Sequence, residues 1–190
     1  MLRENSKAQM SAPFELVIAI IIMMFVLSIG YFAMQQTHQQ VCKEKITKKL
    51  VDFKMALERA LTRKEPVSIF FDLPNECYAD ELEEIKIVEK DDVHICEAYC
   101  GVSQPRCMLL QYTAKKSIEG SEATFGKTLC LNIPTFTTFP SSAGVCLDRS
   151  EDGYILVDLS YEVKQGFYEL INVTKTGDVP TICAYLRTRR

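Results

Sequence analysis

The chain has 190 residues and a mass of 21.6 kDa, enough for one domain with an appendage and too short for a large multidomain enzyme. Hydrophobic residues make up 47% of the chain and charged residues 25%, which excludes a disordered or collagen-like protein. The net charge of -3 lacks the basic surplus with which nucleic-acid binders neutralise phosphates, so we expect no nucleic-acid partner.

The first predicted element is a run of 19 uncharged, mostly apolar residues from Leu16 to Met34. As a helix rising 1.5 Å per residue it is about 28 Å long, which matches the hydrocarbon thickness of a bilayer. A buried core helix is rarely this long without polar residues, and a secretory signal peptide has a shorter apolar region of about 7 to 15 residues. We therefore expect residues 9–34 to form a single transmembrane helix, with the lipid bilayer as a partner.

Two residues mark the start of this predicted helix. Pro13 fits the first turn, where its missing N–H costs no hydrogen bond, and Glu15 complements the positive end of the helix dipole. Glu15 has two interpretations. Its carboxylate either stays at the level of the lipid headgroups, or it pairs with the amino terminus of a neighbouring chain when apolar helices pack side by side.

The residues from Ser6 to Leu16 read SKAQMSAPFEL and lead directly into the apolar helix. This opening resembles the class III signal peptide of archaeal type IV pilins and archaellins, in which a basic and a small residue precede the cleavage site. The resemblance is confined to the leader and the helix behind it. It implies that residues 1–8 are a leader peptide, which a prepilin peptidase removes after Lys7 and Ala8 to make Gln9 the first mature residue.

The resemblance also implies a role for the apolar helix in assembly. Pilin-like subunits form filaments through their N-terminal helices, so Glu15 becomes a candidate helix-packing residue. In that family an acidic residue normally stands at the fifth mature position, whereas Glu15 is the seventh residue counted from Gln9 and Pro13 is the fifth. The opening is also similar to that of uncharacterised single-pass membrane proteins of small archaea.

A second helical pattern follows the apolar run. From Gln35 to Glu65 the chain is polar but keeps an apolar stripe at steps of three or four residues. The stripe consists of Cys42, Ile46, Leu50, Phe53, Leu57, Ala60 and Leu61. Because no glycine or proline interrupts residues 31–65, we expect residues 35–65 to form an amphipathic stalk that continues the membrane helix until Pro66 stops it.

The remaining residues, 66–190, show a β pattern. Short β-branched or aromatic runs alternate with turn-rich pieces. The runs are Val67–Phe71, Ile85–Glu89, Met108–Thr113, Thr128–Ile133, Tyr154–Tyr161, Phe167–Lys175 and Thr181–Leu186. They predict an antiparallel sheet or sandwich, with the fifth and sixth runs forming a hairpin. The predicted fold class is α+β: a long N-terminal helix followed by a β-rich head.

Cysteines indicate the compartment of the head. There are eight of them, at Cys42, Cys77, Cys96, Cys100, Cys107, Cys130, Cys146 and Cys183. An even number beyond a membrane anchor predicts a disulfide framework in an oxidising, extracellular environment. Eight cysteines allow 105 connectivities, so the pairing stays open. A bond from Cys42, on the stalk stripe, would join the stalk to the head.

Zinc and catalysis are weaker alternatives. His94, Cys96, Cys100 and Cys107 fall within fourteen residues but contain no Cys-x-x-Cys pair, and a zinc site would leave the other cysteines unexplained. The sequence has no nucleophile elbow and no His-Glu-x-x-His motif. We therefore predict no metal, no cofactor and no catalytic residue, and we expect a protein that is not an enzyme.

The orientation in the membrane has two conflicting indications. Four lysines follow the apolar helix, between residues 43 and 49, and the positive-inside rule would keep that end in the cytoplasm. A disulfide-bonded head must lie outside, and we follow the cysteines. The sequon at Asn172 agrees with an extracellular head and makes this residue a candidate glycosylation site.

Two functions remain open at this point. The first is a pilin-like, membrane-anchored cell-surface protein, structural or adhesive, which assembles with itself or with other pilin-like subunits as a major or minor filament component. The second is a tethered extracellular binding module that never polymerises, which the displaced position of Glu15 favours. Residues 41–65 carry a charge of +4 and residues 66–190 a charge of -7, so the stalk is basic and the head acidic.

Overall fold

The computed structural model describes residues 12–63, 65–74, 82–118, 121–142, 144–175 and 178–188. Its elements follow in the order α1 (Ala12–Thr62), β1 (Val67–Phe71), β2 (Leu82–Lys90), α3 (Val93–Cys100), β3 (Cys107–Ile118), β4 (Ser121–Leu131), β5 (Tyr154–Val157), β6 (Gly166–Asn172) and β7 (Ile182–Arg187). One long helix precedes two antiparallel sheets, which confirms the predicted α+β class. The chain divides into two compact units, Met1–Lys43 and Glu44–Arg190.

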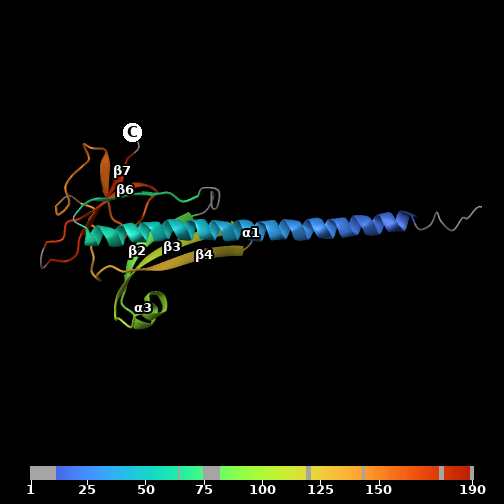
Figure 1. Cartoon of the computed structure of the whole chain (residues 1–190), viewed down its shortest axis with the longest axis horizontal. Coiled ribbons are helices and arrows are strands. Elements are labelled where there is room, and N and C mark those ends of the chain that lie inside the picture. The colour runs from blue at the N-terminus through green and yellow to red at the C-terminus, as the bar shows by residue number, and fades with distance from the viewer. Residues whose placement is uncertain are drawn as a thin grey trace, which may run out of the picture. The chain divides into compact units, whose positions relative to one another are not determined.

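In the first unit, the apolar part of α1 is exposed along its whole length. Its large hydrophobic side chains range from Ile18, which is 42% exposed, to Met34, which is 76% exposed. Among the described residues, α1 is the one helix long and apolar enough to cross a membrane. A helix of suitable length and composition to cross a membrane is thus present where one was predicted, and the same helix continues without a break to residue 62 (Figure 1).

In the second unit, the end of α1 buries the predicted stripe. Ile46, Leu50, Phe53, Leu57 and Ala60 are all fully buried, because a repeat of three and four residues keeps them on one face of the helix. This confirms the amphipathic pattern. The helix ends at residue 62, slightly before the proline that was expected to stop it.

Four strands form the first sheet, in the order β1-β6-β7-β5, with every pair antiparallel. Alternate residues point to its two faces. Phe71, Tyr168 and Leu186 face the core and are buried. Their neighbours Phe70 and Phe167, which are paired across β1 and β6, lie on the outer face.

The predicted hairpin between the fifth and sixth runs is wrong, because β7 separates β5 from β6. The chain after β5 leaves the first sheet and runs along the edge of β2. The amide of Ile87 donates to the carbonyl of Leu159 over 2.9 Å, and the amide of Val163 donates to the carbonyl of Ile85 over 2.7 Å. This segment buries the side chains of Leu159 and Val163 in the core. A tight hairpin between β5 and β6 would leave these apolar side chains exposed to water, which is unfavourable.

The second sheet contains β2, β3 and β4 in that order, and the short helix α3 lies at its end. This helix was not predicted, although its capping signals stand in the sequence. The Asp92 carboxylate accepts hydrogen bonds from the amides of His94 and Ile95, at 2.8 and 3.2 Å, as an N-cap. Gly101 ends the helix with a φ of 66°, in the left-handed region that favours glycine.

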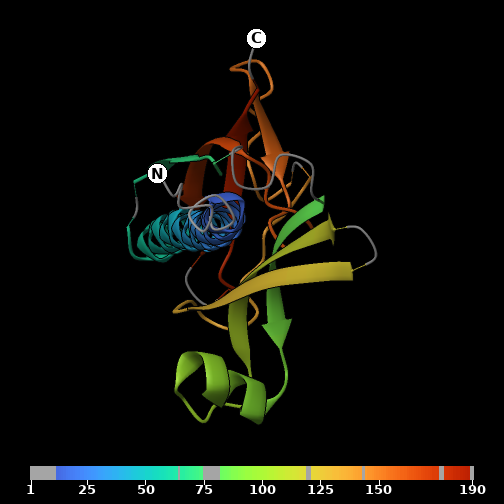
Figure 2. The same cartoon turned by 90° about the vertical axis from the view of Figure 1, so that its right-hand side faces the viewer.

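Phe53 joins the end of α1 to the first sheet. Its ring lies 4.9 Å from that of Phe71 and 5.5 Å from that of Tyr168, centroid to centroid. The hydroxyl of Tyr168 is satisfied inside the core, because it donates to the carbonyl of Lys164 over 2.7 Å. The core therefore consists of one helix face and the inner faces of both sheets (Figure 2).

Candidate functional site

Of the predicted N-terminal site residues, the structure describes Glu15 but not the leader-processing residues. Lys7, Ala8 and Gln9, the predicted leader-processing residues, lie outside the described residues. Glu15 lies in the first turn of α1 and is exposed, as a partner of the helix dipole would be. Its predicted role in helix packing stays a prediction.

Within the described part of the chain, three disulfides join six cysteines to one another. They are Cys96–Cys107, Cys100–Cys130 and Cys146–Cys183, with Cα–Cα distances of 5.6, 5.1 and 5.7 Å. Cys42 is also disulfide-bonded, and Cys77 lies outside the described residues. The head is therefore disulfide-stapled, and the sulfurs considered as zinc ligands beside His94 are bonded to other sulfurs.

Two of the disulfides fix α3 to the second sheet. Cys96 and Cys100 stand four residues apart and lie on the same face of the helix. One reaches the first residue of β3 and the other reaches β4. Because α3 has only eight residues, too few for an isolated helix to be stable in water, these bonds hold it as a rigid end of the head.

The third disulfide attaches the chain before β5 to the outer face of the first sheet, beside a network around Arg149. A guanidinium nitrogen of Arg149 lies 2.8 Å from a carboxylate oxygen of Glu169. The guanidinium carbon lies 4.5 Å from the ring centre of Tyr154 and 5.3 Å from that of Tyr185. The hydrogen bond to Glu169 raises the pKa of Arg149. Stacked and ion-paired, Arg149 fastens this segment to the sheet.

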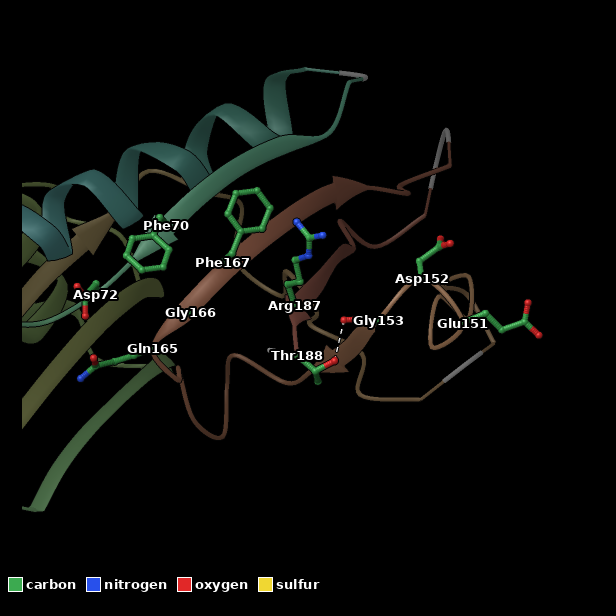
Figure 3. A pocket seen from close by; sticks show the side chains of 10 residues that line it. All are labelled: Phe70, Asp72, Glu151, Asp152, Gly153, Gln165, Gly166, Phe167, Arg187 and Thr188. Atoms are coloured by element: carbon green, nitrogen blue, oxygen red, sulfur yellow. Dashed lines mark hydrogen bonds between the residues drawn. The ribbon is translucent and has the colours of Figure 1, made fainter. Parts of the chain in front are cut away.

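Beside this network, the end of the first sheet is hollowed out, with a volume of about 760 Å³ (Figure 3). The wall draws on β1, β6, β7 and the turn before β5. Its lining residues are Phe70, Asp72, Glu151, Asp152, Gly153, Gln165, Gly166, Phe167, Arg187 and Thr188. This is the candidate site, and we call it the acidic hollow.

Phe70 and Phe167 provide the apolar wall of the acidic hollow. They are cross-strand partners, and Phe70 is 50% exposed. Gly166 keeps the backbone close to β7: it has a φ of 150°, and a Cβ there would lie 2.6 Å from Cδ1 of Leu186. A side chain at this position would force the end of the Leu186 side chain to move, and the positive φ would strain the backbone of any residue other than glycine.

The polar rim of the acidic hollow is mostly negative. Asp72, Glu151 and Asp152 contribute three carboxylates against the single guanidinium of Arg187. Asp152 also lies 3.5 Å from Arg149, whereas the described residues offer no ion-pair partner to Asp72 or Glu151. Figure 3 shows Asp72 on the side of Phe70, whereas Glu151 and Asp152 lie on the other side of the hollow, beyond Arg187.

The structure places the predicted glycosylation residue at the end of β6. The side-chain amide of Asn172 donates to the carbonyl of Leu61 over 2.9 Å, and its oxygen accepts from the amide of Thr174 over 2.9 Å. Both bonds serve the fold: the first ties the end of α1 to the sheet.

The acidic hollow could not be found from the sequence, because its wall combines four segments whose strand order was not predictable. A local signal was Gln165-Gly166 before the sixth run, which was interpreted as leading into the second arm of a hairpin. Comparison with known proteins adds no assignment: no family model, no curated protein and no solved structure matches this chain.

Proposed function

We propose that the protein is a non-enzymatic, pilin-like subunit of the cell surface, anchored by the first half of α1 and exposing a disulfide-stapled head outside the cell. The observation that carries this proposal is the division of one continuous helix of 51 residues into two differently exposed halves. Residues 16–34 expose an uncharged, mostly apolar surface, and the stripe from Ile46 to Ala60 is buried in the head.

The exposed half of α1 has the apolar surface expected of a helix that is embedded in lipid or packed against copies of itself. Exposing this many large apolar side chains to water is unfavourable, at about 25 cal/mol per Å². Small residues such as Ser28 and Gly30 interrupt the bulky ones, and small residues let helix backbones approach closely in a membrane. A bundle of such helices is the proposed means of assembly.

The disulfides support the extracellular location of the head. Structural disulfides persist in oxidising compartments and are rare in the cytosol. Two of these disulfides join α3 to β3 and β4, and none of their four cysteines is a free thiol. These cysteines are Cys96, Cys100, Cys107 and Cys130. We therefore place the head of this membrane-anchored protein outside the cell, where its disulfides remain oxidised.

The test is the intact mass of the protein from cells that contain a prepilin peptidase, together with electron microscopy of sheared surface material. We expect a mass that begins at Gln9 and thin filaments that contain the protein. The variant Lys7→Glu should block cleavage and filament formation. Arg3→Glu makes the same charge change away from the cleavage site and should leave both intact.

A second candidate function is the non-polymerising tethered module. The observation that favours it is the acidic hollow, which is exposed and lined by two phenyl rings and three carboxylates. A mass that retains Met1, with no filaments at any expression level, would support this module and contradict the filament subunit.

A further inference from the structure

We propose that the disulfide between Cys100 and Cys130 is a thiol-exchange site: a small-molecule thiol enters a hollow at the end of α3, opens this bond and forms a mixed disulfide with one of its cysteines. The inference goes beyond the proposed function and does not depend on filament assembly. Three features carry it: the exposure of this disulfide relative to the others, the hollow beside it, and the contacts that remain once the bond opens.

Of the three disulfides whose two cysteines are both described, the bond between Cys100 and Cys130 is the accessible one. Both of these cysteines are partly exposed. In each of the other two bonds, both cysteines are buried. Their exposed fractions are 0% for Cys96, 5% for Cys107, 4% for Cys146 and 0% for Cys183. Because an attacking thiolate must reach a sulfur of the bond, we expect the exposed disulfide to react first.

A hollow of about 590 Å³ gives a thiol a route to this bond. The end of α3, the end of β4 and the loops that follow these two elements line it, and we call it the α3 hollow. Cys100 and Cys130 both border it, together with Tyr99, Gln104 and Thr135. Its volume lies within the range of about 300–1,000 Å³ that is typical of small-molecule sites. The attacking molecule is therefore a small thiol.

Cys107 also borders the α3 hollow, but it is a poor point of attack. Breaking its bond would release a thiolate on Cys96, which is fully buried in an apolar cluster with Leu109. Apolar burial disfavours the charged thiolate and makes it a poor leaving group. The thiolate released from Cys100 or Cys130 lies instead at the border of the hollow, where water solvates it.

The head stays assembled when this bond opens. The disulfide between Cys96 and Cys107 still joins α3 to β3, and α3 keeps its N-cap and C-cap. β4 remains paired with β3 along its whole length. Figures 1 and 2 show α3 at the lower end of the head, away from β6 and β7. Exchange therefore releases α3 from β4 without unfolding the first sheet.

The exchange step balances in bonds and electrons. An external thiolate attacks the sulfur of Cys100 or Cys130, a new sulfur–sulfur bond forms as the old one breaks, and the released cysteine thiolate takes up a proton. A second external thiolate then attacks the external sulfur of the mixed disulfide. This second step leaves both cysteines as thiols and joins the two external molecules as a disulfide, which is a two-electron reduction of the protein.

The experiment treats the folded, full-length protein in detergent with reduced glutathione. Samples are quenched with an alkylating reagent at timed intervals, and the modified cysteines are mapped by mass spectrometry. Cys100 and Cys130 should acquire glutathione or the alkyl group roughly tenfold or more faster than the cysteines of the two buried disulfides. Near-ultraviolet circular dichroism on the same samples should keep the signal of the folded head while this happens.

Gln104→Trp and Ser103→Trp form a matched pair of variants. Both residues are exposed and stand in the loop after α3, but Gln104 borders the α3 hollow whereas Ser103 is not among its lining residues. Gln104→Trp should slow the exchange several-fold, because the indole narrows the route to the sulfurs, and Ser103→Trp should leave the rate unchanged.

Four results would overturn the inference. They are no uptake of glutathione, equally fast reaction of the buried disulfides, loss of the circular dichroism signal together with the bond, and equal rates for the two tryptophan variants. The assay requires neither a filament nor a membrane, so its outcome is independent of whether the proposed function holds.

Discussion

Replacing Phe53 by alanine should strongly destabilise the head, because this ring is the centre of the contact between α1 and the first sheet. Phe53 is fully buried and packs against Phe71 and Tyr168. Truncating a buried phenylalanine to alanine costs about 3–5 kcal/mol of unfolding free energy, through lost burial and the cavity that remains. Domains have total stabilities of about 5–15 kcal/mol, so the loss is a large share of the whole.

For a domain of this size, 1 kcal/mol corresponds to a shift of about 2–4 °C in Tm. We therefore expect Phe53→Ala to lower the Tm of the head by about 6–20 °C. Near-ultraviolet circular dichroism in detergent reports mainly on the head, because seven of the eight tyrosines follow residue 66 and one, Tyr31, lies in the apolar helix. Met55→Ala is the control, because Met55 stands two residues away on the same helix but is 38% exposed. Equal shifts for the two variants would refute the assignment of this helix face to the core.

Three further predictions concern the first sheet. Replacing Cys146 and Cys183 by alanine opens a loop with a sequence separation of 37 and should cost about 4 kcal/mol, measured by chemical unfolding; no change would mean that this disulfide does not constrain the chain. Gly166→Ala should lower stability by about 1–3 kcal/mol, because its Cβ would press on Leu186; an unchanged Tm would contradict the tight approach of β6 to β7. Burial raises the pKa of Tyr168, so the folded state holds this proton more tightly, and stability should fall as the pH rises above about 10. Tyr168→Phe should lose that dependence in a pH series, and an identical alkaline slope would count against it.

Much of the fold could be predicted because its signals are local. The apolar run and the stripe from Ile46 to Ala60 each follow one helical period, and the absence of glycine and proline between them predicted a single helix. The seven strands were found because β-branched and aromatic runs alternate with turn residues. Their ends shifted by several residues, most clearly at the long hairpin of β3 and β4, whose tip is polar.

The rest depends on contacts between distant segments. Strand order was mispredicted because Leu159 and Val163 are drawn to the core beside β2, which no pattern around residue 165 indicates. Helix α3 was missed because it spans only eight residues, although Asp92 and Gly101 cap it. The acidic hollow likewise exists only after the strands are paired, so composition predicted an acidic head without locating its charges.

The structure also explains why the head tolerates a long outer segment between β4 and β5. Residues 132–153 contain no named strand, yet they are fixed at several points. The amide of Asn132 donates to Glu58 over 2.7 Å, and Cys146 is bonded to Cys183. Arg149 then closes the segment onto Glu169. These cross-links hold the segment, and with it the turn that borders the acidic hollow, against the rest of the head.

The most direct test of the account is protease treatment of intact cells that carry the protein, followed by mass spectrometry of the released and retained fragments without reduction. We predict that the head is released in oxidised form, with Cys96 joined to Cys107, Cys100 to Cys130 and Cys146 to Cys183, while the apolar helix stays with the membrane. A head that resists protease until the cells are lysed, and whose cysteines then react as free thiols, would contradict a membrane-anchored head outside the cell.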